Sequence, residues 1–383
     1  MFASSRSPHA GTSGASPQQR HPTSILLAGG GTAGHVSPLL ATADALRRRL
    51  PELTVTALGT QAGLEARIVP QRGYDVRFVP RVPLPRKPDA AMLRFPGALR
   101  SAVEAAGRAI DETGAQVVVG FGGYVSSPAY LAAKRRGIPI VVHEQNARPG
   151  FANRLGARLT AHVATTFPST RLPGATCIGM PLRREISTLD RTASRADARV
   201  SFGLDPDRTT LLVTGGSLGA ARLNQTMAAR SRALTDAGIQ VLHAAGSGKG
   251  FLADRDAAAP PYVVLDYIDR MDLAYAAADL VLCRAGASTV CELTAVGLPA
   301  VYVPLPIGNG EQRVNAADVV AAGGGMLVED AALTPVWVDV VLLPLLTDRD
   351  RVTRMAAAAA TVGRPDADEA LVDLVLNAFS GAS

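Results

Sequence analysis

Two histidines and a glutamate are the side chains in this sequence best placed to move a proton. His35 directly follows a glycine-rich turn at the start of an expected helix, and His143-Glu144 closes the apolar run that begins at Ile140. An imidazole or a carboxylate at the end of a strand can accept the proton of a substrate hydroxyl. His35 is the first candidate for a general base, and His143 with Glu144 is the second. The sequence alone does not separate them.

Three glycine-rich turns each follow a short apolar strand. They span Gly29–His35, Gly120–Tyr124 and Gly215–Ala220. A turn without Cβ atoms that leads into a helix N-terminus presents free backbone N–H groups to an anion. We therefore expect the protein to hold phosphate in more than one place. An enzyme whose donor and acceptor both carry a diphosphate would need this.

Further polar side chains follow strands in the second half of the chain. Gly216 and Ser217 lie in the third turn, where backbone N–H groups and a hydroxyl suit a diphosphate. Glu292 lies one turn into the helix after the strand that ends at Cys283, where a carboxylate can accept both hydroxyls of a ribose. A later loop carries three side chains suited to sugar hydroxyls, Glu311, Gln312 and Asn315.

Other kinds of site are disfavoured by the sequence. Gly29–Gly34 fits G-x-G-x-x-G, but a dinucleotide site also needs an acid at the end of the second strand, which reads Leu58–Gln61. Gly246–Gly250 lacks the Ser or Thr that follows the lysine of a Walker loop. The three cysteines form no C-x-x-C pair, so we expect neither a disulfide nor a zinc site. We expect no metal and no cofactor.

Short apolar strands alternate with helical sequence along the whole chain. Strands are expected in the first half at Ser24–Ala28, Val55–Leu58, Val76–Val79, Val117–Val119, Ile140–His143 and His162–Ala164. In the second half they are expected at Thr210–Val213, Gln240–Ala244, Val263–Leu265, Leu280–Cys283, Ala300–Val303 and Gly325–Val328. Helices between them include Ser37–Arg49, Pro128–Arg136, Arg222–Ala237 and Thr289–Val296. The alternation predicts an α/β protein with two doubly wound parallel sheets. Ligands are then expected beyond the carboxyl ends of the strands, in a cleft between the halves.

The chain is expected to divide into two domains and a tail. Residues 1–22 are rich in Ser, Pro, Gly, Gln and Ala, and predict a disordered tail without a secretory signal. Residues 23–181 form the first domain and residues 182–363 the second, with the boundary at Gly179–Leu182. A final helix within 364–383 is expected to pack back on the first domain. Its apolar residues recur at helical spacing, at Leu371, Leu374, Val375 and Ala378.

Charge is distributed unevenly over the 383 residues, whose net charge is +6. Residues 1–181 hold 21 Lys and Arg against 9 Asp and Glu, a net charge of +12, so the remainder carries −6. No apolar run reaches the roughly 18 residues that span a bilayer, and no nucleic-acid motif is present, so nucleic acid is not an expected partner.

The segment Arg81–Arg100 interleaves basic and apolar residues, a composition typical of contact with an anionic membrane surface. The expected contact residues are Leu84, Arg86, Lys87, Met92, Leu93, Arg94 and Phe95. The alternative is a solvated loop whose apolar side chains pack on the domain.

Six of these strings, in this order, resemble the MurG family of peptidoglycan glycosyltransferases, the undecaprenyl-diphospho-muramoylpentapeptide β-N-acetylglucosaminyltransferases. They are Gly29–His35, Gly122–Val125, His143–Asn146, Gly215–Ser217, Arg284–Ala287 and Glu311-Gln312. The resemblance runs from about Ser24 to the last helix, and Val82–Pro88 resembles the actinobacterial branch. It implies a GT-B fold, with two Rossmann-like domains around a central cleft.

The resemblance also implies an activity. The expected enzyme is an inverting transferase that moves GlcNAc from UDP-GlcNAc to the C4 hydroxyl of the muramoyl unit of lipid I, giving lipid II. It would act as a peripheral protein at the cytoplasmic face of the anionic inner membrane, with cell-wall or division proteins as further partners.

Site residues follow from the matched motifs. The donor side comprises Thr32, Gly34, Asn146, Arg183, Gly216, Ser217, Ile268, Ala287, Glu292, Glu311 and Gln312. The acceptor side comprises Gly31, His35, Tyr124, His143 and Asn146. Two alternatives stay open: another UDP-sugar enzyme of this fold, such as a hexosamine 2-epimerase, and a non-catalytic relative that binds UDP-sugar or lipid diphosphate. Leu218 keeps the second open, because the family usually has Gln there.

Overall fold

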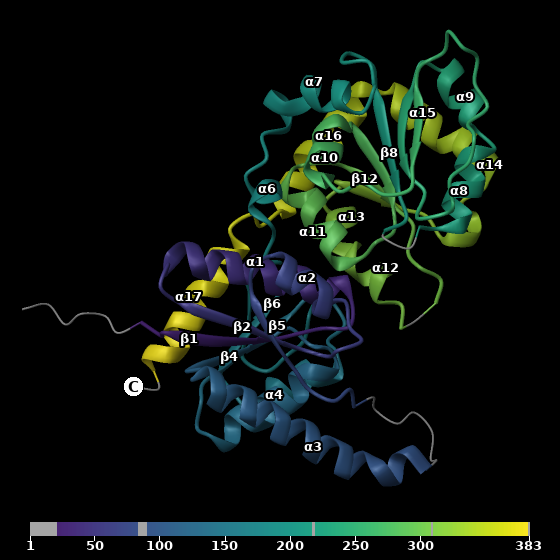
Figure 1. Cartoon of the computed structure of the whole chain (residues 1–383). Coiled ribbons are helices and arrows are strands. Elements are labelled where there is room, and N and C mark those ends of the chain that lie inside the picture. The colour runs from purple at the N-terminus through teal and green to yellow at the C-terminus, as the bar shows by residue number, and fades with distance from the viewer. Residues whose placement is uncertain (1–20, 83–89, 217–218, 308, 382–383) are drawn as a thin grey trace, which may run out of the picture.

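The computed structural model describes residues 21–82, 90–216, 219–307 and 309–381. These residues form two lobes, each built on a parallel sheet with helices on both faces (Figure 1). The tail predicted at 1–22 lies outside the described residues except for its last two. Part of the predicted membrane segment, 83–89, and the pair Ser217-Leu218 also lie outside them.

The first lobe contains a parallel sheet of seven described strands in the order β3-β2-β1-β4-β5-β6-β7. They are β1 (Ser24–Ala28), β2 (Thr54–Gly59), β3 (Asp75–Phe78), β4 (Val117–Gly120), β5 (Ile140–Glu144), β6 (His162–Thr165) and β7 (Ala175–Cys177). The helices that follow them are α1 (Ala33–Arg49), α2 (Glu65–Gln71), α3 (Ala90–Thr113), α4 (Gly123–Arg135) and α5 (Phe151–Gly156). Strand order reverses between β1 and β4, which is where a doubly wound sheet opens a crevice for ligands.

The second lobe repeats this plan with six described strands in the order β10-β9-β8-β11-β12-β13. They are β8 (Thr210–Thr214), β9 (Gln240–Ala244), β10 (Tyr262–Leu265), β11 (Leu280–Cys283), β12 (Ala300–Tyr302) and β13 (Gly325–Leu327). Its helices up to β13 are α6 (Arg184–Ser187), α7 (Arg191–Ser201), α8 (Ala221–Ala228), α9 (Ser231–Asp236), α10 (Met271–Ala277), α11 (Ala287–Ala295), α12 (Glu311–Asn315) and α13 (Ala317–Ala321). After β13 come η1 (Asp330–Ala332), α14 (Pro335–Trp337), the π-helix η2 (Val338–Leu342), α15 (Leu343–Thr347) and α16 (Arg349–Val362). The two sheets confirm the predicted GT-B fold.

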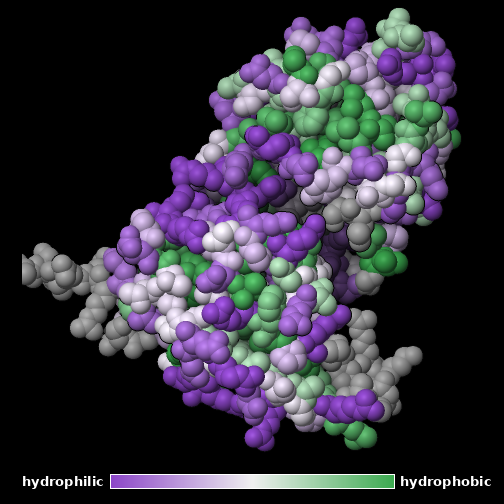
Figure 2. Space-filling view, viewed as in Figure 1, coloured by the Kyte–Doolittle hydropathy of each residue, from purple (hydrophilic) through white to green (hydrophobic). Residues whose placement is uncertain are grey.

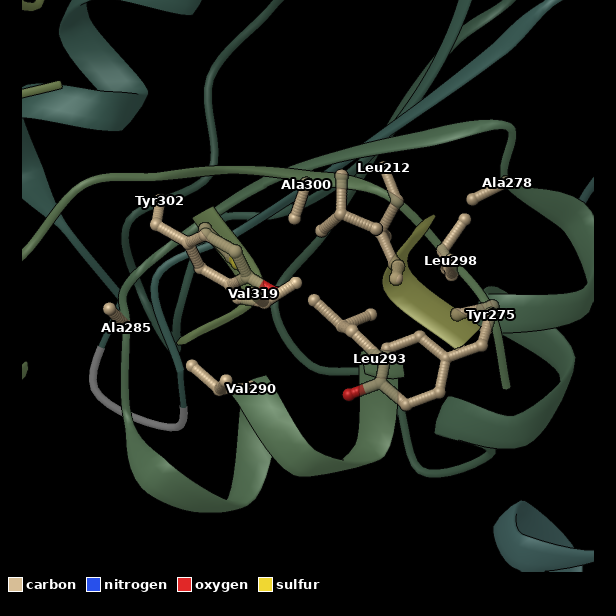
Figure 3. Close-up of a cluster of buried hydrophobic side chains, with 14 of the residues drawn as sticks. Leu212, Tyr275, Ala278, Ala285, Val290, Leu293, Leu298, Ala300, Tyr302 and Val319 are labelled. Atoms are coloured by element: carbon tan, nitrogen blue, oxygen red, sulfur yellow. The ribbon is translucent and has the colours of Figure 1, made fainter. Parts of the chain in front are cut away.

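Both faces of each sheet are covered, because successive strand residues point to opposite sides. In the first lobe Leu27 and Val119 pack with residues of α1, whereas Leu26 and Val118 pack with residues of α3 and α4. In the second lobe Val290 and Leu293 of α11 point into a cluster beneath the sheet (Figure 3). Burying one face of α11 fixes the direction in which its first turn points.

The last helix, α17 (Ala367–Ser380), returns to the first lobe. It lies beside α1 and against β4, β5 and β6, and is the yellow helix beside that lobe in Figure 1. Leu371 and Val375 are fully buried there. Asp368 also pairs with Arg48 of α1 at 2.6 Å. The chain therefore crosses between the lobes twice, once before α6 and once before α17.

Two element boundaries differ from expectation in ways that affect function. α1 begins at Ala33, four residues earlier than predicted, so His35 lies in its first turn. Residues 90–100, predicted to contact membrane, form the start of the 24-residue helix α3. Among the described residues, no helix combines the length and apolarity that crossing a bilayer requires.

Candidate functional site

Two loops of the first lobe meet at His35. The β1–α1 loop and the β4–α4 loop touch so closely that a Cβ on Gly123 would lie 2.7 Å from the Gly30 carbonyl oxygen. A Cβ on Gly122 would lie 3.3 Å from the Nε2 atom of His35. Gly122 and Gly123 also have φ angles of +89° and +78°, which glycine adopts readily. These glycines let the imidazole sit against the second loop.

His35 is partly exposed, and its Nδ1 atom lies 3.1 Å from the Thr32 hydroxyl oxygen. Burial lowers the pKa of His35, while a hydrogen bond to the Gly30 backbone and the charge of Glu65 act in the opposite direction. The ring is therefore neutral at neutral pH, which is the state that accepts a proton. Its position and protonation suit a general base.

Gly31, Thr32 and Gly34 are exposed at the start of α1. No acidic side chain lies in the first turn of this helix, and no side chain caps it. Its N-terminal N–H groups are thus available to an anion. Tyr124 lies nearby in the first turn of α4, 37% exposed, and the guanidinium of Arg81 stands 5.0 Å from its ring centroid.

His143 is placed differently from His35, because it is completely buried. Its Nε2 atom lies 2.9 Å from the Gly179 carbonyl oxygen and its Nδ1 atom lies 3.0 Å from the amide nitrogen of Gln145. Burial lowers the pKa of His143 to about 4, against the effect of the Gly179 hydrogen bond. Both ring nitrogens have partners within the protein, which argues against the general-base role predicted for His143.

Glu144 is 2% exposed and is directed into the β5–α5 loop. Its carboxylate accepts hydrogen bonds from the backbone N–H groups of Asn146 and Gly150 and from the Asn153 amide, at 2.9, 3.0 and 3.0 Å. Burial raises the pKa of Glu144 in spite of these bonds. The arrangement makes Glu144 a brace for the loop and leaves His35 as the exposed candidate base.

The braced loop contacts the second lobe. The backbone N–H of Ala147 donates to the Asn315 side-chain oxygen at 2.9 Å, and the Asn315 amide nitrogen lies 3.4 Å from the Asn146 oxygen. Arg148 donates to the carbonyl oxygen of Asn309. The sequence predicted that Asn315 meets a sugar hydroxyl. In the structure Asn315 is 1% exposed and its amide serves the contact between the lobes, so this prediction is wrong. We call Asn146, Ala147, Arg148, Asn309 and Asn315 the interlobe clasp.

Glu292 and Arg183 come together on the other side of the cleft. Burial raises the pKa of Glu292, and a hydrogen bond from Tyr275 and the charge of Arg183 oppose that rise. The Tyr275 hydroxyl donates to the Glu292 carboxylate at 2.7 Å. One carboxylate oxygen is thereby held, and Glu292 is only partly buried. Its position, next to the cation of Arg183 that directly precedes α6, suits a polar ligand.

The N-terminus of α11 opens toward the same region. Gly286 precedes the helix, its first residue is Ala287, and no side chain caps it. Gly216, with a φ angle of +81°, lies in the loop after β8, next to β11 in the sheet. A Cβ on Gly219 would lie 2.1 Å from the Ala245 carbonyl oxygen, so this loop also requires glycine. Ser217, predicted to bind the diphosphate, lies outside the described residues.

The remaining predicted donor residues lie on segments that pack against α11. Ile268 is 4% exposed in the loop after β10. Glu311 and Gln312 open α12 and are partly exposed. The Gln312 side-chain oxygen accepts the backbone N–H of Leu305 at 2.9 Å, which ties the helix to its own loop. α1 contacts α11 across the lobes, which brings the helix that carries His35 against the helix that carries Glu292. On the face seen in Figure 2, mainly hydrophilic residues gather where the lobes meet.

A further cavity lies between the lobes, near the chain crossings. It has a volume of about 490 Å³ and is lined by residues of both lobes, including Met180, Cys291, Asp318 and Arg364. These four residues belong to the two chain crossings and to the sides of α11 and α13. Asn315, predicted from the sequence to meet a sugar, also lines this cavity. Among the described residues, no group of three or more His, Cys, Asp or Glu side chains is arranged to hold a metal ion.

Sequence reasoning missed the residues that support the site from within. Asn153 links Glu144 to the Tyr130 hydroxyl, which donates to its side-chain oxygen at 2.8 Å. Tyr275 reaches Glu292 from a different helix, and Glu65 reaches the first glycine-rich loop from α2. Each of these residues lies in ordinary helical sequence. No local signal therefore marks them.

The chain resembles known glycosyltransferases over nearly its whole length. Residues 25–165 match the glycosyltransferase family 28 N-terminal domain and residues 210–371 match the glycosyltransferase family 28 C-terminal domain. A UDP-N-acetylglucosamine--N-acetylmuramyl-(pentapeptide) pyrophosphoryl-undecaprenol N-acetylglucosamine transferase of Streptomyces avermitilis is 57% identical, over 93% of this chain and 98% of its own. The protein of the same name from Leifsonia xyli subsp. xyli is 59% identical, over 94% of this chain and 100% of its own.

A solved structure agrees with these relatives. The crystal structure of Acinetobacter baumannii MurG is 31% identical, covers 93% of this chain and 100% of its own, and superposes with a TM-score of 0.76. Sequence and structure thus lead to one conclusion: the chain belongs to the MurG family, within glycosyltransferase family 28.

Proposed function

We propose that this protein transfers N-acetylglucosamine from UDP-GlcNAc to lipid I, the undecaprenyl-diphosphate-linked muramoyl-pentapeptide, and so forms lipid II. Relatives that carry this activity in their names are 57% and 59% identical over more than nine-tenths of the chain. The observation that carries the proposal is a pair of uncapped helix N-termini, those of α1 and α11, on two helices that contact each other across the lobes. Each can hold one diphosphate.

The proposed reaction is a single displacement with inversion at the anomeric carbon. The C4 hydroxyl of the muramoyl unit attacks C1 of GlcNAc, a bond forms between them, and the bond from C1 to the UDP oxygen breaks. The hydroxyl proton passes to the neutral imidazole of His35. Negative charge develops on the leaving diphosphate, where the N–H groups of α11 and of the loop at Gly216 stabilise it. UDP then leaves.

The second lobe is proposed to bind the donor. Glu292 accepts hydrogen bonds from the ribose through the carboxylate oxygen that Tyr275 does not hold. Arg183, close enough for its charge to act on Glu292, approaches the diphosphate. Ser217 would contact the diphosphate, and Ile268 would offer its backbone to uracil. Four further groups complete the proposed donor site: Ala287 with Gly216 at the diphosphate, and Glu311 with Gln312 at the sugar.

The first lobe is proposed to bind lipid I at the membrane. Thr32 and Gly34 line the exposed start of α1, where the acceptor and donor sugar meet. Tyr124 and Gly31 contact the acceptor, and Asn146 stands between the two substrates at the interlobe clasp. No resident cofactor is assigned. His143 and Glu144 are proposed to keep the loop in shape, a role supported by their internal hydrogen bonds.

The membrane contact is proposed at the start of α3. Leu93 is 86% exposed and Arg94 is also exposed, so apolar and basic groups face solvent side by side. Hydrophobic and hydrophilic atoms adjoin at this end of α3 in Figure 2. The exposure of Leu93 speaks against the alternative in which the apolar side chains of this segment pack on the domain. We propose that the protein acts as a peripheral protein at the cytoplasmic face of the membrane, where the lipid acceptor and any cell-wall partners would lie.

One assay separates the proposal from its alternatives. The protein is incubated with labelled UDP-GlcNAc and a lipid I analogue, and the products are resolved. The proposal expects labelled disaccharide-lipid and UDP in equal amounts. Labelled UDP-ManNAc formed without acceptor would identify a 2-epimerase instead. Intact UDP-GlcNAc, bound but not consumed, would identify a non-catalytic binding protein.

A further inference from the structure

Glu65 is a buried carboxylate that none of the sequence motifs includes. It begins α2 and is 0% exposed. One of its oxygens accepts the backbone N–H of Gly31 at 2.8 Å. The other accepts the backbone N–H and the hydroxyl of Thr60 at 2.7 and 3.0 Å. All three donors are neutral. A buried carboxylate held in this way is costly, so it is expected to serve something beyond packing.

Three glycines make room for this carboxylate. A Cβ on Gly30, Gly59 or Gly63 would lie 2.3, 2.3 or 2.1 Å from the nearest atom of Glu65. The glycines come from three separate segments: the β1–α1 loop, the end of β2 and the turn before α2. The three glycines thus leave a space that the Glu65 carboxylate fills. Glu65 therefore lies directly against the β1–α1 loop, which leads to His35.

The peptide between Gly30 and Gly31 transmits the position of Glu65 to His35. No cis peptide bond occurs among the described residues, so the N–H and C=O of this unit point in opposite directions. Because Glu65 holds the Gly31 N–H inward, the Gly30 carbonyl is turned outward. It meets the imidazole there, and its hydrogen bond to His35 favours the protonated ring.

We propose that Glu65 is a positioning residue for the acceptor side of the reaction. It fixes the Gly30–Gly31 peptide and, through the Gly30 carbonyl, orients the His35 ring while its own negative charge favours the imidazolium. Glu65 is the side chain whose charge acts on the His35 ring. Two other charged side chains of the first lobe have different partners: Glu144 serves the β5–α5 loop, and Arg81 lies over the Tyr124 ring. The catalytic part of this inference rests on the proposed function of His35.

The test replaces Glu65 by Gln, which preserves size and removes the charge. The amide NH₂ must then face the N–H of Gly31 or of Thr60, so one hydrogen bond is lost and the loop peptide is released. We expect kcat to fall about 10- to 100-fold, as for a reacting group misplaced by about 1 Å, with KM for UDP-GlcNAc unchanged. Glu52→Gln, an exposed change in the same lobe, is the matched control and should retain wild-type turnover.

A second readout does not depend on activity. The His35 ring is followed by NMR in the labelled protein, with His35→Ala to assign its signal. Glu65→Gln should lower the pKa of His35, and the rise of kcat/KM with pH should move to lower pH with it. If the His35 titration moves but turnover does not, the coupling stands and the catalytic role of His35 fails. An unmoved His35 titration overturns the inference.

Glu65→Asp provides a route that keeps the charge. It withdraws the carboxylate by one methylene from Gly31, so turnover should fall less than in Glu65→Gln, and the His35 pKa should fall less. If Glu65→Gln does not fold, this variant decides. Wild-type turnover and an unmoved His35 signal in folded Glu65→Asp would overturn the inference.

Discussion

His35 and His143 show how burial separates two residues of the same type. His35 follows β1 and His143 lies near the end of β5 in the same sheet, and both were reasonable bases from the sequence. In the structure His143 is completely buried with both nitrogens occupied, whereas His35 is partly exposed beside an open helix N-terminus. Residue type and position at a strand end were predictable. The exposure that distinguishes the two depends on the Gly179 carbonyl and Gln145, which no local pattern reveals.

His35→Ala should reduce turnover about 10²- to 10⁴-fold, the contribution typical of a general base. Affinity for UDP-GlcNAc should stay near wild type, because most of the proposed donor groups lie in the other lobe. Steady-state kinetics measures the turnover, and calorimetric titration with UDP-GlcNAc measures the affinity. His21→Ala changes an exposed histidine just before the first lobe and is the control. Near-normal turnover in His35→Ala would exclude the residue as the base.

Glu292→Ala should weaken UDP-GlcNAc binding by about 1.5–3 kcal/mol, the range for a hydrogen bond to a charged group. Calorimetry against UDP-GlcNAc measures this change. Tyr275→Phe should have a smaller effect, because it removes the internal partner and keeps the carboxylate. Glu185→Ala, exposed on α6, should bind like wild type. Unchanged donor affinity in a folded Glu292→Ala would remove this residue from the proposed site.

At the scale of elements, the sequence predicted most of the strands and where the loops would gather. The exceptions have physical causes. β7 is a three-residue edge strand, too short to display a pattern. The helix expected at Arg222–Ala237 is divided into α8 and α9 at Arg230. There the Arg230 side chain pairs with Asp339 at 3.0 Å, and the Ser231 hydroxyl bonds the Asp254 carbonyl oxygen at 3.1 Å. Tertiary contacts overrode a good local helix signal.

The interlobe clasp joins the β5–α5 loop of the first lobe to Asn309 and Asn315 of the second. Asn315 makes contacts with both Asn146 and Ala147. Asn315→Ala should leave the Ala147 N–H unpartnered, at a cost of about 1–3 kcal/mol. We expect a lower kcat, because the β5–α5 loop and α12 would lose their register across the cleft. Asn315→Asp keeps the acceptor for Ala147 and should be milder. Enzyme assays and thermal melting, run in parallel, separate the effects; a lower melting temperature with unchanged kcat would contradict the coupling.

For the whole molecule, the uneven distribution of charge predicts which lobe faces the membrane. The net charge of +12 on residues 1–181 should draw the first lobe to an anionic bilayer, where each basic residue contributes about 1 kcal/mol. Co-sedimentation with phosphatidylglycerol vesicles should fall sharply at high salt. Changing Arg86, Lys87 and Arg94 to Glu should abolish binding at low salt.

The control for this test makes the same change of charge in the other lobe, at Arg349, Arg351 and Arg354 of α16, all exposed. It should bind vesicles nearly as wild type does. If the α3 variant binds as well as this control, another surface makes the contact. The membrane contact of this segment stays a prediction, and two of its basic residues, Arg86 and Lys87, lie outside the described part of the structure.

The two chain crossings between the lobes lie against each other. A Cβ on Gly179, whose φ angle is +97°, would stand 2.7 Å from the Cβ of Arg364 and 3.1 Å from that of Ala367. Two lobes joined by one connection can rotate relative to each other about several axes. Two connections that lie side by side form a hinge and favour rotation about a single axis. Opening for UDP release and closing on the next donor would then retrace one arc, and each turnover would return the same atoms to the same alignment.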